Sequence, residues 1–143
     1  MEDIIREKFP ELDTLNICST NVYEKKVCQL LGEKFQHCSS KYYDAIFEHV
    51  RLEFKKQSGG QWFDLKKMAD MQVAESNIVI VWFVHKNSKF VDVRINTYED
   101  VILFLDENLT DDWKDWAKSA PHKAEIKFPI SLKQIKDITT SLF

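Results

Sequence analysis

The chain has 143 residues and a formal net charge of −3; 44% of its residues are hydrophobic and 30% are charged. This length and composition predict one globular domain, residues 1–143, with a core large enough to fold without disulfides or a metal ion. The start of the sequence lacks the pattern of a signal peptide, and the longest apolar run, residues 78–84, is too short to span a bilayer. We therefore expect a cytoplasmic protein without a membrane partner.

The first half of the sequence predicts helices. Apolar residues recur at helical spacing within residues 21–35, and Asn21 is the expected N-cap. A second helix is expected from residue 39 or 40 to residue 54, because the same spacing returns there and Ser-Gly-Gly at 58–60 ends the pattern. Residues 62–73 are less clear and favour a short helix.

The middle of the sequence predicts β-strands. Residues 77–85 are dense in β-branched and aromatic residues, and residues 90–97 alternate between apolar and polar positions after a short polar turn. A third apolar run, residues 101–105, completes an antiparallel meander in the interpretation that we prefer. The alternative places this run in a helix that Thr97 caps, with Asp100 in the place of the usual Glu of a capping box.

The end of the sequence predicts a helix, a strand and a second helix. The first helix begins near residues 110–113 and ends at Ala120-Pro121, and residues 124–130 form the strand. Ser131 then caps the last helix. The buried stripe of that helix is expected to consist of Leu132, Ile135, Ile138 and Leu142. The whole pattern predicts an α+β fold in which N-terminal helices and a C-terminal strand and helix accompany an antiparallel β-meander.

Cysteine and histidine residues cluster loosely in the first half of the chain. Cys28, Cys38, His37 and His49 raise the question of a metal site or a thiol nucleophile, but zinc ligands usually come in closely spaced pairs. Free cysteines are more often small buried apolar residues. With Cys18 the cysteines are odd in number, which fits a reducing compartment. We expect neither catalysis nor metal binding here.

Two short motifs have the carboxylate-x-lysine form seen in metal-dependent nucleases. They are Glu53-Phe54-Lys55 and Asp64-Leu65-Lys66. This chemistry needs the pair on a strand, beside a second carboxylate that helps to hold Mg²⁺. Because Glu53 falls in a predicted helix and Asp64 in no predicted strand, we expect both motifs to be incidental. The three glycines form no phosphate-binding loop, so the sequence predicts a protein that is not an enzyme and has no cofactor.

The strongest deviation from an ordinary sequence is a run of acidic residues. Residues 99–115 carry a net charge of −6, while the rest of the chain carries +3. Such a segment suits a basic protein partner and repels nucleic acid and anionic lipid. The alternative is a solvated loop and helix N-terminus, with both tryptophans in the core. The predicted partner-binding residues are Glu99, Asp100, Asp106, Glu107, Asp111, Asp112, Trp113, Asp115 and Trp116.

The second half of the chain has a distinctive order of expected elements. In residues 77–96 an aromatic-rich strand leads through a charged turn into an alternating strand, and residues 101–107 add an apolar run that ends in acids. Residues 111–119 then predict a helix, and residues 124–143 a terminal strand and helix. In this order of elements the second half resembles immunity proteins of contact-dependent growth-inhibition systems, whereas the first half shows no such match.

The resemblance implies a cytoplasmic, non-enzymatic protein that binds a cognate toxin domain, often a nuclease, and covers its active site. The acids would then take the place of substrate phosphates. We expect a monomer or weak dimer that binds a basic toxin and no nucleic acid. Two alternatives stay open: another interaction module, such as a secretion chaperone or a phage-encoded inhibitor, and an enzyme that uses Cys38, His37 or the pair Glu53 and Lys55.

Overall fold

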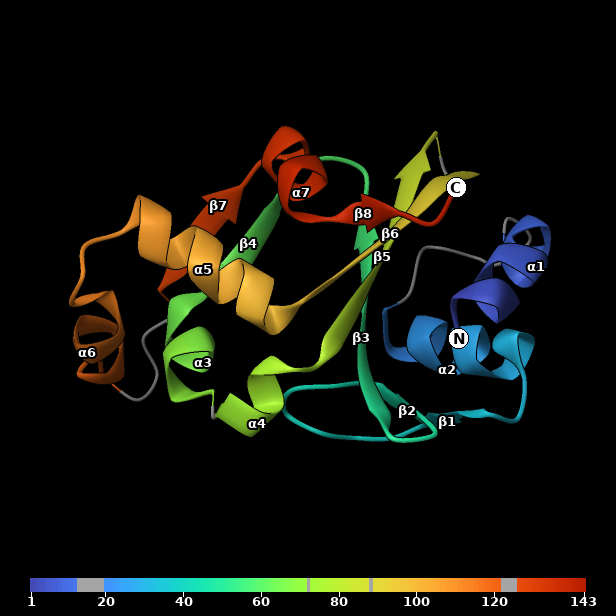
Figure 1. Ribbon diagram of the computed structural model, residues 1–143, viewed down its shortest axis with the longest axis horizontal. Helices are drawn as coiled ribbons and strands as arrows, with labels where there is room; N and C mark the ends of the chain where they lie inside the picture. Colours follow the sequence, from blue (N-terminus) through green and yellow to red (C-terminus); the bar gives the residue numbers. More distant parts are fainter. Residues whose placement is uncertain (13–19, 72, 88, 122–125) are drawn as a thin grey trace.

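The chain folds into an α+β domain built on a mixed six-stranded sheet, with a separate two-stranded sheet beside it (Figure 1). The computed structural model describes residues 1–12, 20–71, 73–87, 89–121 and 126–143. The elements are α1 (Glu2–Leu12), α2 (Thr20–Leu31), β1 (Phe35–His37), β2 (Ala45–Phe47), β3 (Val50–Gln57), β4 (Gln61–Asp64), α3 (Leu65–Asp70), α4 (Val73–Ser76), β5 (Val79–Lys86), β6 (Lys89–Thr97), α5 (Tyr98–Asn108), α6 (Trp113–Lys118), β7 (Lys127–Ile130), α7 (Leu132–Ile138) and β8 (Thr140–Ser141).

The strand order in the large sheet is β1-β2-β3-β5-β6-β8. Antiparallel pairing joins β1, β2 and β3 as well as β5, β6 and β8, whereas β3 and β5 are parallel. The parallel pair requires a crossover, which consists of β4, α3 and α4. Strand β4 pairs instead with β7 in the small sheet.

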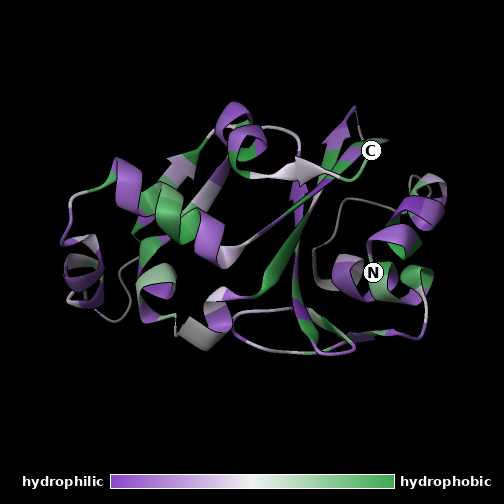
Figure 2. Ribbon diagram, viewed as in Figure 1, coloured by the Kyte–Doolittle hydropathy of each residue, from purple (hydrophilic) through white to green (hydrophobic). Residues whose placement is uncertain are grey.

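Two hydrophobic clusters cover the two faces of the large sheet. Helices α1 and α2 pack over one face, and residues of α3, α5, α6 and α7 pack over the other (Figure 1). Five consecutive residues of β5, from 80 to 84, are buried, because neighbours flank this strand on both sides and on both faces. Figure 2 shows hydrophobic residues concentrated along β5 and in the middle of α5, whose two ends are hydrophilic.

The predicted helix from residue 39 or 40 to residue 54 is wrong. This part of the chain forms the hairpin of β2 and β3, and Glu48 at its turn has a positive φ of 54°, which no α-helix tolerates. In β3 the buried positions Leu52 and Phe54 alternate with less buried neighbours, as expected for a strand. The helix predicted at residues 21–35 is confirmed as α2, but it begins at Thr20, so Asn21 lies inside it and is not its N-cap. The helix ends at Leu31, and the chain turns at Gly32 (φ 112°) into β1.

The two strands predicted in the middle of the chain are confirmed as β5 and β6. The third run, residues 101–105, is helical, so the preferred strand was wrong and the alternative was correct. Thr97 Oγ1 accepts a hydrogen bond from Asp100 N (3.3 Å), and Asp100 Oδ2 accepts one from Thr97 N (2.8 Å), which completes the capping box.

The short helix predicted within residues 62–73 and the two predicted at the end of the chain correspond to α3, α6 and α7. The predicted last strand is confirmed for Lys127–Ile130, whereas residues 124 and 125 lie outside the described residues. Helix α7 ends at Ile138, so Leu142 does not continue its stripe and packs in the cluster on the α1–α2 side.

Replacing Thr97 by Ala is expected to lower the free energy of unfolding by about 1 kcal/mol, because the first turn of α5 loses one side of its capping box. Urea denaturation measures this difference. Thr140→Ala, at an exposed position of β8, is the matched control and should change stability less. Equal stability of the two variants would contradict a stabilising role for the cap.

Candidate active site

Strand β3 presents Glu53 and Lys55 on the face of the sheet that is covered by α3 and α5. In the parallel register with β5, Glu53 is the partner of Ile80 and Lys55 is the partner of Trp82. Ile80 and Trp82 belong to the cluster on that face, whereas the intervening Phe54 belongs to the opposite cluster. The alternation of the strand therefore brings a carboxylate and an ammonium group, both partly buried, to the same side.

Asp44 lies immediately before β2 and is hydrogen-bonded to β3 on both its main chain and its side chain. Its backbone N donates to Leu52 O (2.7 Å), and its Oδ2 accepts from Phe54 N (2.8 Å). Asp44 O accepts from Cys38 N (2.9 Å), which ties the same residue to the end of β1. A side-chain hydrogen bond joins Asp44 to Glu53. These bonds hold the Asp44 carboxyl beside the carboxylate-x-lysine pair.

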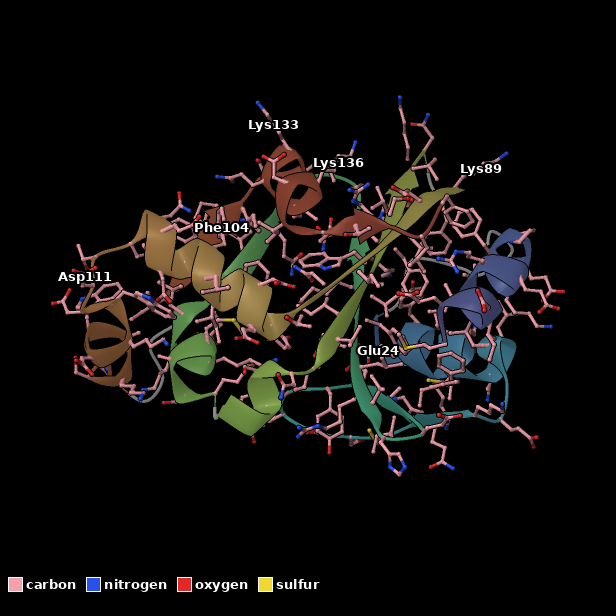
Figure 3. All side chains as sticks on the ribbon, in the orientation of Figure 1. Glu24, Lys89, Phe104, Asp111, Lys133 and Lys136 are labelled. Atoms are coloured by element: carbon pink, nitrogen blue, oxygen red, sulfur yellow. The ribbon has the colours of Figure 1, made fainter. Side chains whose placement is uncertain are left out.

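Helix α2 adds a third carboxyl group. Glu24 makes a side-chain hydrogen bond with Asp44, and Figure 3 places Glu24 on the side of α2 nearest to β3. Its neighbours Tyr23 and Val27 anchor the helix in the cluster on that face of the sheet. Asp44 is thus the common partner of Glu24, which comes from one face, and Glu53, which comes from the other.

The protonation of these groups is strongly perturbed. Burial raises the pKa of Glu53 to about 7; the charge of Asp44 and a hydrogen bond from it raise that pKa further, while Lys55 and Lys67 oppose the rise. Burial, followed by the charge of Asp44, likewise raises the pKa of Glu24 to about 7. Burial also lowers the pKa of Lys55. Perturbed groups that gather in one place mark candidate functional sites.

Aromatic residues surround the cluster on the α3–α5 side. The Tyr98 side chain is 1% exposed, and burial, followed by the nearby charge of Glu53, raises the pKa of its hydroxyl. Lys55 Nζ lies 5.6 Å from the centroid of the Phe63 ring. Lys67 Nζ of α3 lies 6.0 Å from the centroid of the Tyr98 ring. Apolar rings lower the local dielectric, which strengthens the interaction of the charged groups with one another and with any ligand.

The acidic cluster can be reached from solvent. A hollow of about 440 Å³ opens beside α2 and the segment between β1 and β2. Its lining consists of Glu24, His37, Cys38, Ser39, Ser40, Lys41 and Asp44. Two of the three carboxyl groups therefore face a space large enough for a small ligand and are not sealed in the core.

The three carboxyl groups raise the question of a cation site. Carboxylate oxygens are the ligands that Mg²⁺ and Ca²⁺ prefer. Within the described residues, however, no group of three or more His, Cys, Asp and Glu side chains is placed so that it could hold a metal ion. Because the pKa values of Glu24 and Glu53 are raised to about 7, a divalent cation would have to displace protons from these two groups.

The reason given for setting aside Glu53-Phe54-Lys55 does not hold in the structure, because Glu53 lies in a strand and Asp44 supplies a second carboxylate. The other motif is structural. Asp64 caps α3 by accepting from Lys66 N (3.0 Å), and Lys66 Nζ donates to the backbone O of residue 120 (2.8 Å). Sequence reasoning missed Glu24 and Asp44 entirely, since they lie 29 and 9 residues before Glu53 and belong to no motif.

The cysteines are poor nucleophiles in this fold. Burial raises the pKa of the Cys28 thiol to about 12 and also raises the pKa of the Cys38 thiol, so little thiolate forms at neutral pH. His37 and His49 are exposed. Cys18 lies outside the described residues. The cysteine pair lies next to Asp44 without adding a reactive group to the site.

The acidic residues of segment 99–115 serve several purposes. Asp100 caps α5, and Asp106 Oδ1 accepts a hydrogen bond from Trp113 Nε1 (2.7 Å). Trp113 is 2% exposed and belongs to the core, so its predicted role as an anchor for a partner is wrong in this fold. Trp116 is 54% exposed on α6. The other predicted residues, all exposed, are Glu99, Glu107, Asp111, Asp112 and Asp115.

The raised pKa of Glu53 predicts a specific pH dependence of stability. The usual value is 4.5 and the folded value is about 7, so the associated stability is fully present below about pH 4.5 and is lost as the pH rises through about 7. Glu53→Gln keeps the group neutral at every pH. At about pH 8 this variant should be more stable than the wild type by about 1 to 3 kcal/mol, and at about pH 4 the two should differ little.

Urea denaturation across this pH range measures the difference. Glu107→Gln, at an exposed position of α5, is the control and should leave the pH profile of stability unchanged. A wild-type profile that Glu53→Gln does not alter would show that Glu53 ionises as freely in the folded protein as in the unfolded chain.

Comparisons with known proteins assign no family to the chain. No protein-family model matches it, and no curated protein matches it either. The resemblance to contact-dependent growth-inhibition immunity proteins stays a prediction. In the described part of the chain, no helix is both long and apolar enough to cross a membrane.

Proposed function

We propose that the protein is a divalent-cation-dependent enzyme that cleaves phosphodiester bonds in nucleic acid. The observation that carries this proposal is the convergence of Glu53 and Lys55 on one side of β3 with the carboxyl group of Asp44, which β3 itself holds by a hydrogen bond of 2.8 Å from Phe54 N. Strand-borne carboxylate-x-lysine pairs beside a second carboxylate are the arrangement that metal-dependent nucleases use.

In the proposed reaction the carboxylates and the lysine have different roles. Asp44 and Glu53, with Glu24 beside them, are the residues that would supply oxygen ligands to a divalent cation. Such a cation would supply activation of a water molecule and neutralisation of charge on a phosphate. Lys55 supplies a positive charge in a partly buried place, where it stabilises developing negative charge more strongly than it would in bulk water. Its lowered pKa brings an ammonium group closer to the range in which it exchanges a proton near neutral pH.

Cation binding and cleavage test the proposal together. Mg²⁺ or Mn²⁺ should raise the melting temperature of the wild type, and the rise should grow from about pH 6 to about pH 8 because Glu24 and Glu53 must lose protons. Asp44→Asn should abolish both this shift and the cleavage of DNA and RNA substrates. Lys55→Met should keep the shift and slow cleavage by about 100-fold or more.

Lys66→Met provides the matched control, since it changes the lysine of the structural motif and should leave cleavage unchanged. Cation-independent melting of the wild type, together with cleavage no faster than in Asp44→Asn, would overturn the proposal.

A second candidate function is the binding of a basic toxin domain, as an immunity protein binds its toxin. The exposure of Trp116 beside acidic residues favours it. Trp116 and Asp112 line a hollow of about 520 Å³ at the start of α6, and Asp111 and Asp115 are exposed nearby. An aromatic anchor inside an acidic rim suits a cationic partner, because charge speeds the encounter and the ring supplies affinity.

This second function predicts a salt-dependent association with the cationic domain encoded beside the gene. Replacing Glu107, Asp111 and Asp115 by their amides should slow association at low salt by about tenfold, and Trp116→Ala should mainly speed dissociation. Asp106 is left in place because it holds Trp113. Stopped-flow fluorescence measures both rates. An association rate that the triple variant does not change would contradict this function.

A further inference from the structure

A hollow of about 710 Å³ lies among α5, the end of α7 and the end of β6 (Figure 1). Residues of α1, β5 and β8 complete its lining, so segments that are far apart in the chain meet there. The hollow shares no lining residue with the one beside the acidic cluster of the candidate active site. Its volume falls within the range of about 300 to 1,000 Å³ that is usual for ligand-binding sites.

Four carboxyl groups line this hollow, and no basic side chain does so among the described residues. Three helices supply them, as Glu2, Asp100, Glu107 and Asp137. Glu107 and Asp137 are exposed and make no ion pair or side-chain hydrogen bond with another described residue. Glu2 is 3.9 Å from Arg6 Nη2, and Asp100 Oδ2 serves the cap of α5. The two carboxylates without partners therefore attract a positive charge into the hollow.

Asn96 of β6 adds a buried hydrogen-bond donor to the same hollow. Its side chain is 7% exposed, and its Oδ1 accepts a hydrogen bond from Trp82 Nε1 (2.7 Å), which fixes the orientation of the amide. In the described part of the chain, Asn96 Nδ2 has no acceptor. A buried donor without a partner costs free energy that a bound acceptor recovers. Since Asn96 lines the hollow, an occupant that carries a carbonyl oxygen as well as a positive charge fits it best.

The remaining surface of the hollow favours an extended peptide. Leu103 of α5 lines it with a side chain that is 54% exposed. Strand β8 pairs with β6 only at residues 94 and 95, so Asn96 and Thr97 have no strand neighbour on that side within the described ranges. An extended peptide has a carbonyl group at every residue and can lie along such an edge. Lysine and arginine side chains place their charge on an apolar stem, which suits the exposed Leu103.

We propose that this hollow binds an extended, lysine- or arginine-bearing segment of another protein. A basic side chain of the segment pairs with Glu107 and Asp137, and one of its backbone carbonyls accepts a hydrogen bond from Asn96 Nδ2. The same carboxylates repel nucleic acid, so the ligand of this hollow differs from that of the candidate active site. The hollow also shares no lining residue with the one that contains Trp116. The binding of this segment is independent of the proposed function.

Isothermal titration calorimetry with a synthetic peptide tests this binding site. The probe alternates three lysines with two leucines, has an acetylated and an amidated end, and is titrated into the full chain at low ionic strength. Glu107→Gln combined with Asp137→Asn should weaken binding by about tenfold and reduce its dependence on salt. Leu103→Ala should weaken binding by about fivefold through lost apolar contact.

Two exposed positions outside the hollow provide matched controls. Glu99→Gln makes the same change as Glu107→Gln on the same helix, and Val91→Ala removes an exposed apolar side chain as Leu103→Ala does. Both should leave the affinity unchanged within about twofold. Spermidine carries three charged amines on an apolar chain but no carbonyl group, so it should bind about tenfold more weakly than the peptide.

Three results would overturn the proposal. The first is a wild-type protein that does not bind the peptide. The second is a loss of affinity in the Glu107 and Asp137 double variant that is no larger than in Glu99→Gln. The third is spermidine binding as tight as peptide binding, which would assign the hollow to a simple organic cation. Trp116→Ala should leave the affinity unchanged, and a loss equal to that of the double variant would place the peptide at α6 instead.

Discussion

The parallel pairing of β3 with β5 is the constraint on which the rest of the structure depends. Parallel neighbours cannot be joined by a tight turn, so the chain must leave the sheet after β3 and return through β4, α3 and α4. This crossover lays α3 over the face of β3 that carries Glu53 and Lys55. The hairpin of β2 and β3 lies on the side of β3 that faces away from β5, and Asp44 immediately precedes the paired residues of β2. The pairing of β3 with β5 thus determines the position of α3 on one side of the candidate site and of Asp44 on the other.

The charged groups of the candidate site lower the free energy of unfolding, and the rest of the fold compensates for this cost. Burial disfavours the charged forms of Glu53 and Lys55, and neighbouring like charges add to this cost. The cost is smallest while Glu24 and Glu53 are protonated, because their raised pKa values favour the neutral forms. A divalent cation would replace those protons with a stronger attraction. The arrangement is therefore less stable near neutral pH than an apolar one would be, which is the usual relation between a binding site and the stability of its scaffold.

Local patterns in the sequence predicted the elements whose signals are unambiguous. The capping residue Ser131 and the dense apolar run of β5 act within a few residues, so they can be recognised without the fold. The cap at Thr97 was considered only as an alternative, because the apolar run that follows it suits a strand as well as a helix. The β2–β3 hairpin could not be recognised in the same way. Its apolar residues, among them Ile46 and Val50, fall at spacings that suit a helix equally well, and the decisive feature is the positive φ of Glu48 in the turn.

The candidate site could not be predicted from the sequence for a related reason. Its carboxyl groups come from α2, from the residue before β2, and from β3, and only tertiary structure brings these three segments together. The motif Glu53-Phe54-Lys55 was recognised, but it was set aside because Glu53 was wrongly placed in a helix. The motif that begins at Asp64 has the same form but a structural role, because its carboxylate caps a helix and its lysine donates to a backbone carbonyl. A carboxylate-x-lysine motif therefore does not identify a site without the fold. Trp113, held by Asp106, likewise could not be assigned to core or surface from spacing alone.

The charge pattern of the sequence argued against nucleic acid, and the structure changes the weight of that argument. The acidic segment extends along α5 to α6, and Figure 3 places Asp111 near the α6 end of the molecule, well away from Glu24. Salt screens exposed charges over a Debye length of about 10 Å at 0.1 M, so distant carboxylates act weakly on a ligand at the candidate site. What a phosphate meets there is set by the local groups, which include Lys55 and Lys67. The net charge of a chain therefore bears on solubility and steering, whereas the ligand of a site follows from the few charges that the fold gathers around it.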